Sequence, residues 1–192
     1  MEGKKRKIVL AITGASGSIY AQTLLDNLQK LEMPPEEIAV IITSTGRDIW
    51  IDETGKKFEA IGSAKEYDND TYYAPFASGS SQYDTMIICP ASMGAIGRIA
   101  NGTSDDLIAR AADVMLKERR KLIIIPRETP YSLIHLKNME KLTLSGAIIC
   151  PASPSFYSKP ATINDLVSTV VDRIIDLAGF QSNNSYRWME ND

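Results

Sequence analysis

Small polar residues and a few charges follow directly after several apolar runs of this sequence. The stretches are TGASGS (13–18), TSTG (43–46), CPASMG (89–94), PRETP (126–130) and CPASPSFY (150–157). They offer backbone amides, hydroxyls, an arginine and a carboxylate, which are groups that hold anions and polar rings. They contain no histidine. Acid–base chemistry at these stretches therefore falls to carboxylates or to the substrate itself.

The first stretch fits neither common nucleotide motif. Gly14-Ala15-Ser16-Gly17 lacks the Lys-Ser/Thr pair of a P-loop and the G-x-G-x-x-G spacing of a dinucleotide fold. What remains is a short turn whose amides and Ser16 hydroxyl face the start of a helix. Such a turn suits a phosphate or a ring carbonyl, and a plain tight turn is the alternative.

Charged and aromatic residues also stand at or near the predicted strand ends. Arg127 and Glu128 follow a strand and lie between two prolines, which favours a rigidly positioned site. Arg119 and Arg120 close a helix, and we expect them to be a solvated helix terminus. Tyr157 follows the last predicted strand, where a site residue and a buried core tyrosine are equal interpretations.

The composition of the sequence excludes several kinds of protein and site. The chain has 192 residues, 44% of them hydrophobic, and a net charge of −3, so it has no overall basic field for nucleic acid. No apolar run approaches the roughly 20 residues of a membrane span, and we expect a cytoplasmic protein. Cys89 and Cys150 are expected to be reduced thiols. His135, the one histidine, excludes multi-histidine metal sites and is expected to be a structural helix residue.

Apolar strands alternate with amphipathic helices along the chain. The patterns predict strands over 7–13, 37–43, 84–90, 121–126 and 147–151, and helices over 18–31, 44–55, 95–102, 105–120, 130–146 and 162–179. Ser44 is expected to cap the second helix, and Thr162 and Gly179 the last one. Residues 55–83 are polar and predict a long surface excursion. This order predicts an α/β, doubly wound, mainly parallel Rossmann-like sheet with helices on both faces and its ligand at the carboxyl ends of the strands.

The sequence resembles the UbiX-like flavin prenyltransferases, formerly described as aromatic acid decarboxylases. The resemblance rests on TGASGSIYA (13–21), APFASGSS (74–81), a long block over 89–165 and a terminal RW (187–188), and it covers nearly the whole chain. It implies one flavin-binding domain over 1–192, with a tail over 180–192 that covers the site.

The resemblance also implies an activity. Family members join a dimethylallyl group from dimethylallyl phosphate to N5 and C6 of reduced FMN, and they need no metal. The prenylated FMN then serves a partner UbiD-type decarboxylase. Family members form homo-oligomers, commonly dodecamers, with sites at subunit interfaces. The alternative is a non-catalytic FMN-binding accessory subunit of an aromatic acid decarboxylase. The related cysteine-decarboxylating flavoproteins rely on an early histidine, which His135 does not match.

Site roles carry over to matching positions. The implied catalytic residues are Ser16, Glu53, Glu128 and Lys117. The implied FMN contacts are Gly14, Ala15, Ser16, Ser44, Ser92, Met93, Gly94, Ala95 and Arg127. The implied prenyl-phosphate contacts are Arg110, Lys117, Tyr157 and Arg173, with Trp188 covering the pocket.

The chain departs from the common family pattern at a few positions. Ala95 stands where a threonine is usual, Asp106 where an asparagine is usual, and Tyr72 and Tyr73 near the place of a tryptophan. Ala95 removes a hydroxyl from a flavin-contacting turn. We expect these changes to affect flavin affinity and donor choice rather than the fold.

Overall fold

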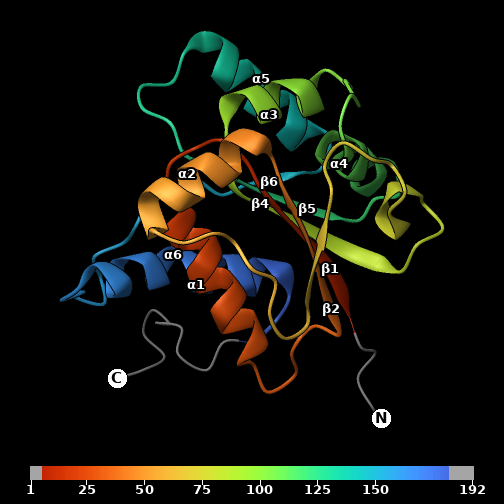
Figure 1. The fold of residues 1–192 in the computed structure, drawn as a ribbon. Coiled ribbons are helices and arrows are strands. Elements are labelled where there is room, and N and C mark those ends of the chain that lie inside the picture. Colours follow the sequence, from red (N-terminus) through yellow and green to blue (C-terminus); the bar gives the residue numbers. More distant parts are fainter. Residues whose placement is uncertain (1–5, 182–192) are drawn as a thin grey trace.

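Six parallel strands form one sheet in the order β3-β2-β1-β4-β5-β6, as the computed structural model shows for residues 6–181 (Figure 1). The strands are β1 (Lys7–Ile12), β2 (Glu37–Ile42), β3 (Ala64–Tyr67), β4 (Tyr83–Ala91), β5 (Lys121–Pro126) and β6 (Ile148–Ile149). The helices are α1 (Ser18–Gln29), α2 (Ser44–Thr54), α3 (Met93–Ala100), α4 (Leu107–Lys117), α5 (Leu133–Leu144) and α6 (Ile163–Ala178), with a 3-10 turn η1 (Pro75–Ala77). Strand order reverses between β1 and β4, and the expected doubly wound parallel sheet is confirmed.

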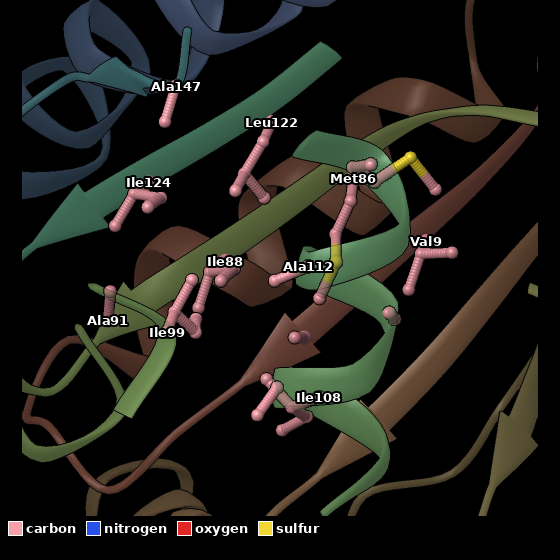
Figure 2. Close-up of a cluster of buried hydrophobic side chains, with 14 of the residues drawn as sticks. Val9, Met86, Ile88, Ala91, Ile99, Ile108, Ala112, Leu122, Ile124 and Ala147 are labelled. Carbon is pink, nitrogen blue, oxygen red and sulfur yellow. The ribbon is translucent and has the colours of Figure 1, made fainter. Parts of the chain in front are cut away.

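Helices cover both faces of this sheet (Figure 1). Alternate residues of each central strand point to opposite faces, so Val9 packs on the side of α3, α4 and α5, and Leu10 on the side of α1 and α6. Figure 2 shows the first layer, where Met86 and Ile88 of β4 meet Ile108 and Ala112 of α4. Strands buried on both faces explain the continuous apolar runs of the sequence.

The segment 55–83 is more than the expected surface excursion. Ala64–Tyr67 adds an edge strand to β2, and η1 buries Phe76 completely. The Phe76 ring lies 5.0 Å from that of Tyr67 and 5.2 Å from that of Tyr83, both edge-on. The strand is short and half polar, which hid it from the pattern. The segment is therefore anchored in the core on the side of α4.

Helix ends differ in detail from the expected ones. Thr43, not Ser44, caps α2, because its hydroxyl accepts the Gly46 amide at 3.0 Å. The expected caps of α6 are confirmed, with Thr162 at its start and Gly179 at its end. The predicted strand over 147–151 is only two residues long. Within residues 6–181, no helix has the length and apolarity needed to cross a membrane.

Candidate flavin site at the carboxyl edge of the sheet

A cavity of about 520 Å³ opens where the carboxyl ends of β1, β2 and β4 meet. Gly14 follows β1, Ser44 follows β2 and Ser92 follows β4, and all three predicted contacts line it. The cavity lies at the point where strand order reverses, which is the usual ligand site of open α/β sheets. The strand topology thus brings three separate stretches of sequence to one place.

The turn after β1 is closely packed. A Cβ atom at position 14 would lie 2.8 Å from Thr45 Cγ2, so a side chain there would separate this turn from the start of α2. Gly17 has a φ of 116° and begins α1, a conformation that favours glycine. These two constraints explain why the turn between β1 and α1 is built from glycines.

Glu53 lies against this turn. Its carboxylate accepts the Ser18 amide at 2.7 Å and the Gly17 amide at 3.0 Å, so it satisfies the free amides at the start of α1. The residue is exposed in the single chain, but some desolvation of its carboxylate opposes the charge. Hydrogen bonds from the Ser16 hydroxyl and from the two amides outweigh this desolvation and lower the pKa of Glu53. Glu53 is therefore ionised at neutral pH, and the helix start already holds an anion of the protein itself.

Arg127 connects the turns after β1 and β4. Its Nε donates to the Ser16 carbonyl at 3.0 Å, and its amide donates to the Ala91 carbonyl at 3.3 Å. Ser16, Glu53 and Arg127 thus lie together, although they are far apart in the sequence. Glu128 is next in the chain, and its carboxylate accepts the Thr129 amide at 3.0 Å.

The turn after β4 leaves open space above α3. Ser92 caps this helix, with its hydroxyl accepting the Ala95 amide at 3.3 Å. A Cβ atom at Gly94 would meet no atom within 4 Å. Ala95 takes part in this cap through its backbone amide, so the cap does not need a hydroxyl at position 95.

Arg110 and Lys117 lie elsewhere in the chain. Both are on α4, which starts next to the cavity at Asp106 and ends near the start of β5. An 11-residue helix is about 16 Å long, so Lys117 lies toward the opposite edge of the sheet. Arg110 donates to the Ala77 carbonyl at 3.0 Å, and Lys117 pairs with Glu118. Arg110 therefore lies in the first turn of α4, at the end nearer the cavity, and Lys117 lies at the far end.

Arg120 is not the solvated terminus that we expected. Its guanidinium donates to the carbonyls of Gly79 and Tyr83, and so fixes the segment before β4 to the end of α4. The neighbouring Arg119 is exposed and has a φ of 56°. Helix periodicity could not separate the two arginines, because the carbonyls come from a loop some 40 residues away.

Tyr157 and Arg173 lie on the segments that follow β6. Tyr157 is 69% exposed, which excludes the buried core tyrosine considered above. Arg173 is on α6, and its charge partly offsets the burial that raises the pKa of Cys150. Trp188 lies outside the described residues.

The far wall of the cavity holds residues that the sequence patterns did not single out for a site. They are Arg47, Asp68, Asn69, Asp70, Arg98, Asp105 and Asp106. Arg47 pairs with Glu66, and Arg98 pairs with Asp105 and Asp106. Asp106 also caps α4 by accepting the Ala109 amide at 2.7 Å, so it performs the capping that an asparagine would perform. The capping pattern could have flagged Asp106, since aspartate is a preferred residue at a helix start.

The remaining candidate groups are structural. Both cysteines are free thiols, and burial raises the pKa of Cys89. His135 forms a capping box with Ser132 at the start of α5, which confirms its structural role. Among residues 6–181, no group of three or more histidine, cysteine, aspartate or glutamate side chains could hold a metal ion.

Comparison with known proteins decides the family. The sequence model of the Flavoprotein family matches residues 1–175. Flavin prenyltransferase UbiX of Methanocaldococcus jannaschii is 43% identical over 184 residues, covering 95% of this chain and 98% of the relative. UbiX of Pseudomonas aeruginosa is 40% identical over 203 residues, covering 99% of this chain and 97% of the relative. The chain belongs to the UbiX flavin prenyltransferase family.

Solved structures agree with this assignment. The structure of AnUbiX (PadA1) in complex with FMN and dimethylallyl pyrophosphate is 36% identical in sequence and has a TM-score of 0.86. The match covers 96% of this chain and 98% of the AnUbiX chain. A dodecameric FMN-dependent UbiX-like decarboxylase from Escherichia coli O157:H7 is 35% identical and has a TM-score of 0.87. The match covers 95% of this chain and 99% of the chain in that structure. The peptidyl-cysteine decarboxylase EpiD, at 17% identity and a TM-score of 0.61, shares the fold alone.

Proposed function

We propose that this UbiX family member is a flavin prenyltransferase that transfers a dimethylallyl group from dimethylallyl phosphate to N5 and C6 of reduced FMN. The observation that carries the proposal is the 43% identity to a flavin prenyltransferase across 95% of the chain. Glu53 of α2 and Arg127 after β5, which the resemblance implies for the site, are both hydrogen-bonded to the turn after β1. Their arrangement supports the same activity.

The cavity fits a flavin mononucleotide. It has about 520 Å³ of space and is lined by hydroxyl residues from the segments after β2 and β4. The neighbouring first turn of α3 is open at Gly94, where a Cβ atom would meet no atom within 4 Å. The residues that would hold FMN are Gly14, Ala15, Ser16, Ser44, Ser92, Met93, Gly94, Ala95 and Arg127. Reduced FMN would supply the nucleophilic N5 and C6 atoms.

Glu53 and Ser16 are the proton-handling pair in this proposal. Glu53 is ionised because the turn holds its carboxylate, and its pKa is lowered in part by the Ser16 hydroxyl. A carboxylate in this state accepts a proton through that hydroxyl. Glu128, close to Arg127, is the second carboxylate proposed for the site.

Cationic residues would stabilise the leaving phosphate of the prenyl donor. We assign this role to Lys117, Arg110, Arg173 and the Tyr157 hydroxyl. Lys117 lies at the end of α4 that is remote from the cavity of its own chain, and the Arg110 side chain is bonded to the Ala77 carbonyl. A second copy of the chain would therefore supply them, and each site would be completed between neighbouring subunits.

The surface of the chain is consistent with a homo-oligomer. We propose a dodecamer, as in the Escherichia coli neighbour. Large apolar side chains of α5 are exposed in the single chain, namely Leu133, Ile134, Leu136 and Leu144. Exposed apolar groups gathered on one helix are typical of an interface. In the same proposal the protein works in the cytoplasm and delivers its product to a UbiD-type decarboxylase.

Anaerobic incubation tests the activity directly. The purified protein is mixed with reduced FMN and dimethylallyl phosphate, and the released flavin is weighed by mass spectrometry. We expect a flavin heavier by one five-carbon prenyl unit. Recovery of unmodified FMN, with both dimethylallyl phosphate and the pyrophosphate as donors, would contradict the proposal.

A further inference from the structure

Thr13, the residue between β1 and the Gly14 turn, is hydrogen-bonded to residues 90–92 at the end of β4. Gly14 and Ser92, which follow these two strands, both line the cavity. Thr13 is buried, with 1% of its surface exposed. Its hydroxyl donates to the Pro90 carbonyl at 2.8 Å and accepts the Ser92 amide at 2.7 Å. The same hydroxyl therefore acts as donor and as acceptor, and both hydrogen bonds connect the end of β1 to the end of β4.

The backbone alone gives a weaker connection at this point. The Thr13 amide donates to the Pro90 carbonyl at 3.2 Å, but the Ser92 amide is satisfied by the Thr13 side chain. A side chain that cannot accept would leave that part-buried amide without its protein partner, which costs free energy. The position of Ser92, which caps α3, thus depends on a hydroxyl at position 13.

We infer that Thr13 is a positioning residue for flavin binding: its hydroxyl holds the Gly14 turn and the Ser92 turn at the separation that the flavin requires. The inference rests on the proposed FMN site, since it concerns the spacing of two turns that line it. Thr13 itself contacts no part of the proposed ligand. It acts through Ser92 and the backbone of residues 90–92.

Two variants isolate the hydroxyl. Thr13→Val keeps the shape and removes both hydrogen bonds, and Thr13→Ser keeps the hydroxyl and removes the methyl group. Thr85→Val is the matched control, because Thr85 is also fully buried and its hydroxyl also bridges two groups, Arg6 and Asp84. Thr85 lies near the amino-terminal end of β4, far from the cavity.

The measurement is the dissociation constant of FMN, with the thermal midpoint recorded alongside. Without its hydrogen bond, the Ser92 turn relaxes in the flavin-free Thr13→Val protein and must be reordered when FMN binds. We expect Thr13→Val to weaken FMN binding about tenfold, a loss on the scale of one buried hydrogen bond. Thr13→Ser should restore the affinity, and Thr85→Val should lower the thermal midpoint without changing the affinity.

Unchanged FMN affinity in Thr13→Val would overturn the inference, and so would an equal loss of affinity in Thr13→Ser. If Thr13→Val does not fold, the inference is tested instead by the rate of hydrogen exchange of the Ser92 amide in the wild-type protein. Protection before FMN is added supports the inference, and free exchange overturns it. Flavin affinity is read without any donor, so a failure of prenyl transfer is distinguishable from a failure of this inference.

Discussion

At the scale of single residues, the site is defined by a carboxylate that satisfies a helix start. Glu53 accepts the amides of Gly17 and Ser18, where the sequence pattern led us to expect a ligand phosphate or a ring carbonyl. The helix dipole favours an anion at this place, and the protein supplies that anion from α2. An incoming flavin therefore meets a negative charge beside the turn, together with the Ser16 hydroxyl.

Glu53→Gln tests the chemical role of this charge. The amide oxygen of glutamine can still accept from the turn, so we expect FMN affinity to stay within about twofold. Loss of the carboxylate removes the proton acceptor, and we expect the prenylation rate to fall on the order of 100-fold. Mass spectrometry of the released flavin measures the rate, and fluorescence titration measures the affinity.

Asp52→Asn is the control for that variant. Asp52 is the preceding residue of α2 and is exposed, as Glu53 is, but Glu53 is the residue that accepts the Gly17 and Ser18 amides. The same change of charge at Asp52 should therefore leave both quantities unaltered. Full turnover in Glu53→Gln would remove Glu53 from the proposed chemistry. Equal losses in the two variants would point to overall charge as the cause.

At the scale of elements, α2 places Ser44 beside the cavity at its start and Glu53 against the start of α1 in its last turn. The sequence predicted Ser44 as the helix cap, and the structure assigns that role to Thr43. Two adjacent hydroxyl residues both satisfy the capping pattern. Only the exit angle of β2 decides which hydroxyl turns back onto the helix, and a one-dimensional pattern does not contain that angle.

Paired variants separate these two hydroxyls. Thr43→Ala removes the bond to the Gly46 amide, and we expect it to lower the free energy of unfolding by about 1 kcal/mol. Ser44→Ala removes no cap, so its stability should stay within about 0.5 kcal/mol of wild type. Chemical denaturation of the flavin-free protein measures both. A larger loss in Ser44→Ala would reverse the assignment.

The elements themselves were largely predictable. Strands buried on both faces, such as β1 and β5, appear as unbroken apolar runs, and their bounds agree with the expected ones within one residue. β3 and Arg120 escaped prediction for a different reason. The role of each depends on a partner distant in sequence, the edge of β2 for one and the carbonyls of residues 79 and 83 for the other.

At the scale of the whole molecule, the candidate site residues fall into two groups. Ser16, Glu53 and Arg127 gather around the turn after β1. Arg110 and Lys117 lie along α4, which leads away from that turn. Motif matching could give all of them one function but could not show this separation, because it carries no information on which chain supplies each residue.

A mixing experiment tests whether two copies complete one site. Glu53→Gln and Lys117→Ala should each be nearly inactive alone, because each lacks one necessary group. If Glu53 of one chain acts with Lys117 of its neighbour, oligomers assembled from equal amounts of both variants contain some sites with neither substitution. Random assembly gives about a quarter of such sites, and we expect about that fraction of wild-type prenylation after the variants are unfolded and refolded together.

The same mixture without co-assembly is the control, and it should stay inactive. Absence of any recovery in verified mixed oligomers would place both residues in one chain's site. That result would require α4 to move so that Lys117 reaches the Gly14 turn, although Ile108 and Ala112 on the apolar face of α4 are packed into the core (Figure 2). Because a packed helix does not shift by its own length at small cost, recovery is the result that this fold favours.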